Sequence, residues 1–291
     1  MRLCFNQVTA GRSAPEDLAA QLAAVRRGGW EAIELWLRHW DSYLETHSLA
    51  QARRLLDDAG LTAAGGCGQP GLLFARGAQL HDIRDQFARR LEQCQALGAA
   101  HLVITPGPGQ LPEQPSVAAL DEAADNLRFA AERAAAHGVG LGIEFLKGAR
   151  LVNNLPTALW LADRVDHHSV GVVVDTFHLY AGLSKLEDLA LLAHTPERLF
   201  FVHVNDVPGG KPRELWTDPD RVLPGEGSVP VTAILAAIRD TGYTGYASLE
   251  LFNDAFALRW AESPATAAAA SAQAYRATAR VFESLRELRA P

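Results

Sequence analysis

The chain has 291 residues, of which 48% are apolar and 21% are charged, and only three are cysteine. These proportions are typical of a globular protein and exclude a disordered chain, a collagen and a disulfide scaffold. The 27 basic residues are outnumbered by 34 acidic ones, and because the resulting net charge is −7 and no basic stripe exists, we expect no nucleic-acid partner.

Short β-rich runs alternate with longer helical segments from one end of the chain to the other. Eight strands are predicted, at residues 3–6, 32–36, 62–67, 101–105, 140–145, 171–175, 199–205 and 246–251. Segments rich in Ala, Leu, Arg and Glu follow the strands and predict helices, for example at 14–27, 80–97, 118–137 and 264–288. Several strands, such as the one at 171–175, are almost entirely apolar, which is typical of parallel strands buried on both faces.

Glycines mark the ends of the expected helices. They stand shortly before the next strand, where a left-handed helix cap is expected, at Gly28, Gly60, Gly98, Gly138 and Gly242. No linker rich in Pro or Ser interrupts the pattern, so we predict one domain over residues 1–291, a (β/α)8 TIM barrel, rather than two modest domains. An open doubly wound sheet is the alternative, but it would need a glycine-rich phosphate turn after an early strand, and the sequence has none.

The cysteines and the N-terminal segment indicate the compartment. Cys4, Cys67 and Cys94 are odd in number, widely spaced and form no CxxC pair, as expected for reduced thiols. The N-terminal segment turns polar at Asn6, unlike a secretory signal, and no apolar run approaches the length of about 18 residues that a membrane span needs. We therefore expect a cytoplasmic protein with no membrane partner.

Ionisable side chains end the four late strands, and the carboxyl ends of strands are where a TIM barrel holds its catalytic groups. These side chains are Glu144, Asp175, His203 and Glu250. Three carboxylates in one barrel mouth repel one another unless a cation separates them, so the pattern predicts a divalent metal site. A set of oxygens with a single imidazole suits Mn²⁺, Mg²⁺ or Co²⁺ better than a thiolate-type zinc site. We expect Mn²⁺ first, with Mg²⁺, Co²⁺ and Zn²⁺ as alternatives.

Three further polar residues near the strand ends are candidates for substrate binding. His178 follows the sixth strand and could reach a substrate hydroxyl, or it could pack within a loop. Asp206 could bind substrate or orient His203, or it could simply form a turn. Glu34 ends the second strand and could hydrogen-bond to substrate, although a carboxylate there can also cap a helix or pair with an arginine.

The connection between the seventh and eighth strands is about 40 residues long, more than a plain crossover needs. We therefore predict an active-site flap at about residues 206–229. Arg221 lies within it and could donate a fork of hydrogen bonds to a hydroxylated substrate, or it could form an exposed salt bridge.

The order of motifs on the late strands, Glu, Asp-x-x-His, His-x-x-Asp and Glu, resembles the xylose-isomerase-like barrel superfamily of sugar isomerases and epimerases. Within that superfamily, the chain is similar to the inosose isomerases of bacterial inositol catabolism at residues 1–6, 43–49, 175–178, 215–227 and 248–252. The resemblance runs along nearly the whole chain. It implies a TIM barrel whose metal ligands are Glu144, Asp175, His203 and Glu250.

The resemblance also implies a reaction. A keto-inositol or a related unphosphorylated keto-sugar would lose a proton next to its carbonyl and pass through a metal-bound enediolate. Glu144 and Glu250 would be the catalytic residues that exchange this proton. The strand-three region at 65–70 is richer in glycine than in inosose isomerases, and strand ends in the first half of the barrel shape the substrate pocket. Trp260 and Phe282, on the last helices, could serve a homo-oligomer interface or pack against the barrel.

Three other functions share these features. A lyase resembling 3-dehydroshikimate dehydratase would use the same metal and the same proton abstraction but would then expel water. An endonuclease of the apurinic-site type shares the fold, but it needs more metal ligands and a basic face, which the net charge of −7 disfavours. A non-catalytic sugar-binding module would leave the four converging ionisable groups unexplained.

Overall fold

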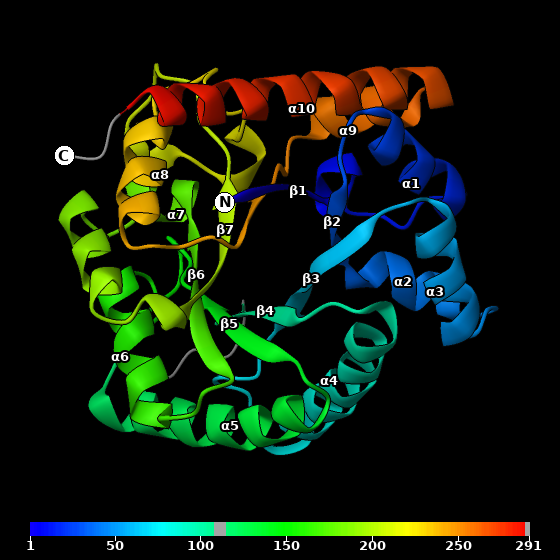
Figure 1. Ribbon diagram of the computed structural model, residues 1–291. Helices are drawn as coiled ribbons and strands as arrows, with labels where there is room; N and C mark the ends of the chain where they lie inside the picture. Colours follow the sequence, from blue (N-terminus) through cyan, green and yellow to red (C-terminus); the bar gives the residue numbers. More distant parts are fainter. Residues whose placement is uncertain (108–114, 289–291) are drawn as a thin grey trace.

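Eight parallel strands close into a barrel in the computed structural model, which describes residues 1–107 and 115–288 (Figure 1). Each strand pairs with the next along the chain, and β8 returns to pair with β1. The strands are β1 Arg2–Asn6, β2 Ala32–Trp36, β3 Thr62–Pro70, β4 His101–Thr105, β5 Gly140–Glu144, β6 Val170–Asp175, β7 Leu199–Val204 and β8 Tyr246–Leu249. The predicted (β/α)8 fold is confirmed. The largest difference in a strand bound is at β3, which continues to Pro70 instead of ending at residue 67.

Helices surround the barrel, and the longest, α10, lies along one side of it (Figure 1). It packs against α1, α8 and α9. The helices are α1 Leu18–Arg27, α2 Leu37–Leu44, α3 Leu49–Asp58, α4 Gly77–Leu97, α5 Val117–Ala136, α6 Leu155–Val165, α7 Thr176–Ala181, α8 Val231–Asp240, α9 Asp254–Ala261 and α10 Pro264–Glu287. Gly98 ends α4 in the left-handed region, with φ 79°, as the glycine pattern predicts.

The crossover between β6 and β7 is less regular than the sequence pattern suggests. It contains the six-residue helix α7 and then a 3₁₀ segment at Leu186–Ala193, with no long α-helix. The backbone turns extended at Gly182, directly after α7, with φ −94° and ψ −151°. A Cβ on Gly182 would lie 2.4 Å from the carbonyl oxygen of His178, so this close approach requires glycine.

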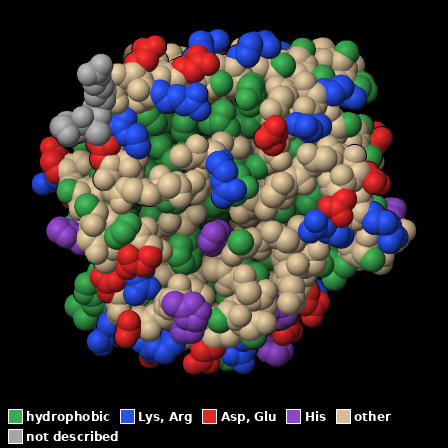
Figure 2. Space-filling model, viewed as in Figure 1, with side chains coloured by type: hydrophobic (Ala, Val, Ile, Leu, Met, Phe, Trp, Pro, Cys, Tyr) green, Lys and Arg blue, Asp and Glu red, His purple; other side chains and the backbone are tan. Residues whose placement is uncertain are grey.

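The barrel interior contains a small apolar cluster that includes Cys4, Cys67 and the ring of Phe201. A Cβ on Gly65 of β3 would lie only 3.1 Å from that ring, so glycine at this position leaves room for it. Both cysteines are buried and unpaired. None of the described helices is long and apolar enough to cross a membrane. Figure 2 shows acidic and basic side chains interspersed on the face it displays.

Candidate active site

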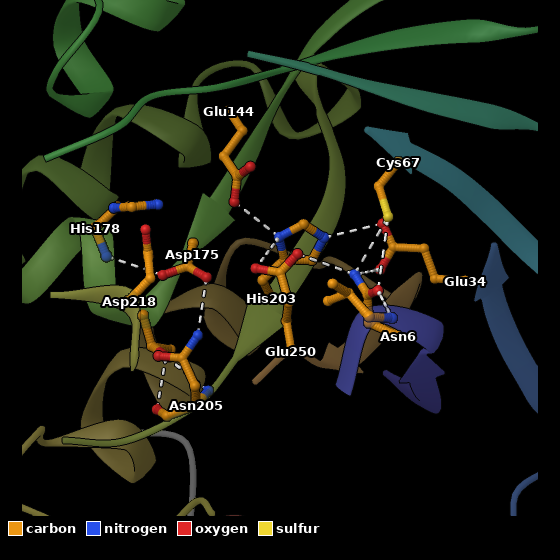
Figure 3. Close-up of polar contacts among 12 residues, drawn as sticks. Asn6, Glu34, Cys67, Glu144, Asp175, His178, His203, Asn205, Asp218 and Glu250 are labelled. Atoms are coloured by element: carbon orange, nitrogen blue, oxygen red, sulfur yellow. Dashed lines mark hydrogen bonds and ion pairs between the residues drawn. The ribbon is translucent and has the colours of Figure 1, made fainter. Parts of the chain in front are cut away.

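The carboxyl ends of β5 to β8 bring four side chains of metal-ligand type together, as Figure 3 shows. One ligand atom from each of Glu144, Asp175, His203 and Glu250 lies within 4.8 Å of the other three, and all four residues are buried. The register explains this convergence, because Asp175 of β6 stands directly opposite His203 of β7. In a closed parallel barrel, all strands end at the same rim.

His203 stands at the centre of this cluster, with a carboxylate on each side of its ring (Figure 3). Its Nδ1 lies 2.8 Å from Glu144 Oε1 and 3.4 Å from Glu250 Oε2. Its Nε2 lies 3.0 Å from Glu34 Oε1. Burial lowers the pKa of His203, but the carboxylates of Glu250, Glu34 and Glu144 outweigh burial and raise this pKa well above its ordinary value. A carboxylate oxygen therefore lies within hydrogen-bond distance of each ring nitrogen.

Arg221 supplies a second positive charge to the cluster. Its Nη1 donates to Asp175 Oδ2 at 2.9 Å and to Glu250 Oε2 at 2.8 Å, and its Nη2 donates to Asp218 Oδ1 at 2.7 Å. Burial raises the pKa of Asp175, but Arg221, together with His203 and the backbone N–H of His178, outweighs burial and holds this pKa below its ordinary value. Burial also raises the pKa of Glu250, to about 8, although His203 opposes this rise.

His178 lies beside Arg221 at the edge of the same cluster, on α7. Its backbone N–H donates to Asp175 Oδ1 at 2.9 Å, and its Nδ1 accepts from the backbone N–H of Lys147 at 3.2 Å. Its Nε2 lies 3.1 Å from Arg221 Nη2. Burial lowers the pKa of His178, so its ring is neutral near pH 7.

A pocket of about 180 Å³ opens over this cluster. Its floor contains Glu144, Glu250, His178 and Arg221. Its remaining walls are Trp36, Arg38, Cys67, Gly68, Pro70, Val103, Thr105, Leu146, Asp218 and Phe252. Pockets for drug-sized ligands usually measure about 300–1,000 Å³, so this one has room for a single small ring.

Two of the expected substrate-binding residues do not line the pocket. Glu34 does not end the second strand as predicted, because β2 continues to Trp36; it is fully buried and its carboxylate contacts Nε2 of His203, on the side of the ring away from Glu144 (Figure 3). Asp206 is also buried, and its carboxylate accepts the backbone N–H groups of Val207 and of three residues at 225, 227 and 229. Asp206 also pairs with Val222 through two backbone hydrogen bonds of 3.0 and 2.8 Å, which closes the base of the 206–229 segment.

Two asparagines in the site are absent from the predicted set. Asn6 ends β1 and donates to both Glu34 and Glu250. Asn205 follows β7 and donates from Nδ2 to Asp175 Oδ2 at 2.9 Å. Both residues end apolar strands, which is the same signal that identifies the ionisable residues, so extending the search to amide side chains would have found them.

The donor set fits a divalent cation. It offers three carboxylates and one imidazole, and Glu144 Oε2 makes no hydrogen bond to any described residue. Oxygen-rich sets of this kind suit hard or borderline divalent ions. The residues present therefore match a metal site in both chemistry and spacing.

Comparison with known proteins places this barrel in a family. A family model described as a xylose isomerase-like TIM barrel matches residues 22–284. The chain belongs to the xylose isomerase-like TIM barrel family. The chain is similar to an inosose isomerase of Bacillus licheniformis, which is 28% identical over 260 residues that cover 87% of this chain and 89% of that protein.

Two further members of the family are informative. A 3-dehydroshikimate dehydratase of Pseudomonas aeruginosa is 32% identical over 249 residues, or 82% of this chain, but the chain spans only 37% of that protein's length. A crystal structure of an IolI protein with a zinc atom superimposes with a TM-score of 0.83 at 26% identity, covering 98% of this chain and 99% of that one.

Proposed function

We propose that this protein is a metal-dependent isomerase or epimerase of a keto-inositol or a related unphosphorylated keto-sugar. The observation that carries the proposal is the convergence of Glu144, Asp175, His203 and Glu250. Two of them, Glu144 and Glu250, line a pocket with room for one small ring. The inosose isomerase relative, aligned over most of both chains, supports the same class of reaction and substrate.

The four converging side chains would hold the metal. A divalent ion there supplies Lewis-acid stabilisation of the negative charge that develops when a proton next to a carbonyl is removed. The oxygen-rich donor set supports Mn²⁺ as the working ion, and the zinc atom in the IolI structure supports Zn²⁺ as the first alternative.

Glu144 and Glu250 would exchange the substrate proton. Both line the pocket, yet each is at least 95% buried, with exposed fractions of 5% and 3%. Glu250 Oε1 accepts from Asn6 and Oε2 accepts from Arg221, so its carboxylate is held in place at the pocket. Glu144 keeps one oxygen, Oε2, free of hydrogen bonds to the described residues.

Arg221 and His178 would orient the substrate. Arg221 lines the pocket, so its guanidinium would donate to a substrate oxygen there. The His178 ring is neutral, and its Nε2 lies beside the guanidinium, 3.1 Å from Arg221 Nη2. Both residues hold their position through Asp175, which links substrate orientation to the proposed metal site.

The 206–229 segment would act as a flap over the pocket. It carries Arg221 and Asp218 into the pocket wall, and Asp206 and Val222 close its base. Lys147, three residues past Glu144, donates from Nζ to the carbonyls of residues 213, 214 and 216 within the segment. Opening and closing of this segment would admit substrate and exclude water.

The test is turnover of a defined substrate panel. Protein reconstituted with Mn²⁺ is incubated with keto-inositols, with ketoses and with 3-dehydroshikimate, and the products are identified by NMR and mass spectrometry. We expect a product of unchanged mass from a keto-inositol or a ketose, and no product after the metal is chelated. No conversion of any neutral keto-compound by the metal-saturated protein would contradict the proposal.

A second candidate is a lyase that resembles 3-dehydroshikimate dehydratase. It is favoured by Arg38, which lines the pocket, is exposed and makes no ion pair or hydrogen bond with any described residue. A guanidinium binds a carboxylate through two parallel hydrogen bonds, and dehydroshikimate carries a carboxylate whereas an inosose is neutral. The dehydratase relative from Pseudomonas aeruginosa supports the same alternative.

One variant separates the two candidates. Arg38→Ala should raise the KM for 3-dehydroshikimate at least tenfold if the enzyme is this lyase, and the product should be lighter by one water. The matched control is Arg54→Ala, which removes an exposed arginine from α3, away from the pocket walls. Equal turnover of dehydroshikimate by both variants would eliminate Arg38 as a carboxylate contact.

A further inference from the structure

We infer that Asn6 and Glu34 are positioning residues that set the orientation and the protonated nitrogen of His203 and hold Glu250 in place for metal binding. The inference rests on the proposed metal site and assigns roles to two residues outside the ligand set. Both are completely buried, and neither lines the pocket.

Glu34 uses both carboxylate oxygens inside the protein. Oε1 lies 3.0 Å from His203 Nε2, and Oε2 accepts from Asn6 Nδ2 at 2.8 Å. A buried carboxylate with both oxygens engaged is held in one orientation. It therefore presents a fixed acceptor to the side of the imidazole that faces away from the proposed ligands, as Figure 3 shows.

The orientation of the Asn6 amide is fixed by the backbone. Its Oδ1 accepts from the N–H of Val8 at 3.0 Å, so the amide nitrogen must point to the other side. From there Nδ2 donates to Glu34 Oε2 at 2.8 Å and to Glu250 Oε1 at 3.0 Å. One amide therefore holds two carboxylates from two different strands, β2 and the end of β8.

The consequence for His203 follows from counting donors and acceptors. A neutral imidazole donates from one nitrogen and accepts or ligates through the other. Because Glu34 can only accept, Nε2 keeps its proton, and Nδ1 is the nitrogen left to bind an ion. Nδ1 is also the nitrogen that lies 2.8 Å from Glu144 and 3.4 Å from Glu250. Carboxylates that bind the far nitrogen of a ligating histidine usually affect metal affinity about 10–100-fold.

Glu34→Gln is the sharpest single change because it keeps the shape and removes one acceptor. Its single side-chain oxygen can face either His203 or Asn6, and the introduced NH2 then opposes a donor on the other side. If the NH2 group faces Nε2, the His203 ring has to carry its proton on Nδ1 instead. That proton prevents Nδ1 from binding an ion. Asn6→Asp instead removes the donor and places a carboxylate against Glu34 and Glu250.

The double variant E34Q/N6D restores the pairing with the roles exchanged. The introduced amide can accept from His203 Nε2 and donate to the introduced carboxylate, and the net charge of the pair equals that of the native residues. The hydrogen bond to Glu250 stays lost, and the introduced carboxylate lies against Glu250 as it does in N6D. If the pair only stabilised the fold, the exchange would change the metal-free melt and leave the Mn²⁺ affinity of each folded variant near the native value.

The experiment is Mn²⁺ titration by calorimetry on the full chain, with a metal-free thermal melt to confirm folding. We expect E34Q and N6D each to weaken Mn²⁺ affinity about 10–100-fold, and E34Q/N6D to bind more tightly than either single variant. Glu31→Gln is the matched control, because Glu31 is exposed at the opposite end of β2. If E34Q does not fold, Asn6→Ser replaces it, since this change removes both amide donors while a hydroxyl can still accept from Val8.

A second readout reports the proton directly. In the Zn²⁺-loaded protein, ¹⁵N NMR of the histidine rings should show the proton of His203 on Nε2. Native Mn²⁺ affinity in both single variants, or a proton on Nδ1, would overturn the inference and leave the proposed function standing. Absence of any Mn²⁺ or Zn²⁺ binding by the native chain would overturn both. Metal binding without turnover of any substrate would overturn the proposed function alone.

Discussion

Asp206 is expected to hold the flap closed, and Asp206→Asn tests this role. The carboxylate accepts four backbone N–H groups: Oδ1 from Val207 and Val229, both at 2.8 Å, and Oδ2 from Gly225 and Gly227, both at 3.0 Å. In D206N an NH2 group replaces one oxygen. Two of the four backbone donors then lose their acceptor and face another donor.

The expected cost follows from these contacts. A hydrogen bond to a charged group contributes about 1.5–3 kcal/mol, so the loss of two predicts about 3–6 kcal/mol. Burial raises the pKa of Asp206, although the backbone N–H groups oppose this rise, and the neutral amide avoids the desolvation of a carboxylate. We therefore expect the lower end, about 3 kcal/mol, which increases the open population of the flap about 100-fold.

Amide hydrogen exchange measures that population residue by residue. The amides of Gly225, Gly227 and Val229 should exchange about 100-fold faster in D206N, while those of β5 keep their native rates. Gly227→Ala should act similarly, because a Cβ there would lie 2.3 Å from Asp206 Oδ1. Native exchange rates at these amides in folded D206N would refute the role of Asp206, and so would an equal acceleration throughout the barrel.

Three further predictions concern pH, the flap and the metal. Burial lowers the pKa of His39 from 6.5 to about 4. As the pH drops, the unfolded chain therefore binds this proton before the folded one does. The free energy of unfolding should fall by about 3 kcal/mol in all between about pH 6.5 and pH 4. Measured by urea unfolding, the free energy of unfolding of His39→Leu should not show this fall with pH; a fall equal to that of the native protein would contradict the assignment. Lys147→Met should leave the barrel folded but speed limited proteolysis within residues 207–217, since three carbonyls lose their donor; native cleavage rates would show that Lys147 does not hold the flap. Saturating Mn²⁺ at about 1,000 times its Kd should stabilise the protein by about 4 kcal/mol and raise the Tm by about 7 °C, and chelation should reverse the shift; a Tm indifferent to Mn²⁺ would argue against the site.

The site residues that end strands are predictable from sequence, because their place at the end of a strand also fixes their place at the barrel rim. Glu144, Asp175 and His203 each end or nearly end an apolar run, and a parallel barrel places all such ends at one rim. No contact between them has to be known in advance. The topology alone brings them within reach of one another.

The roles of Glu34 and Asp206 are not predictable in this way. Asp206 follows a strand as ligands do, and Glu34 lies in the middle of β2, yet Glu34 contacts the imidazole and Asp206 binds only backbone N–H groups. The partner of each carboxylate depends on how deeply its side chain lies in the barrel, to within a few ångströms. Packing between neighbouring strands sets that depth. The short 3₁₀ crossover at Leu186–Ala193 is similar, because its apolar and acidic residues are equally compatible with an α-helix.

The central claim is that Glu144 and Glu250 move a substrate proton at a metal site. The most direct measurement is deuterium incorporation next to the carbonyl of a converted keto-inositol or ketose in D₂O, followed by NMR for the native protein, E144Q and E250Q, each with Mn²⁺. The account predicts incorporation by the native protein and a loss of at least 100-fold in each folded variant, because one general acid or base typically contributes about 10²–10⁴-fold. Conversion without deuterium incorporation, or native incorporation rates in both variants, would contradict it.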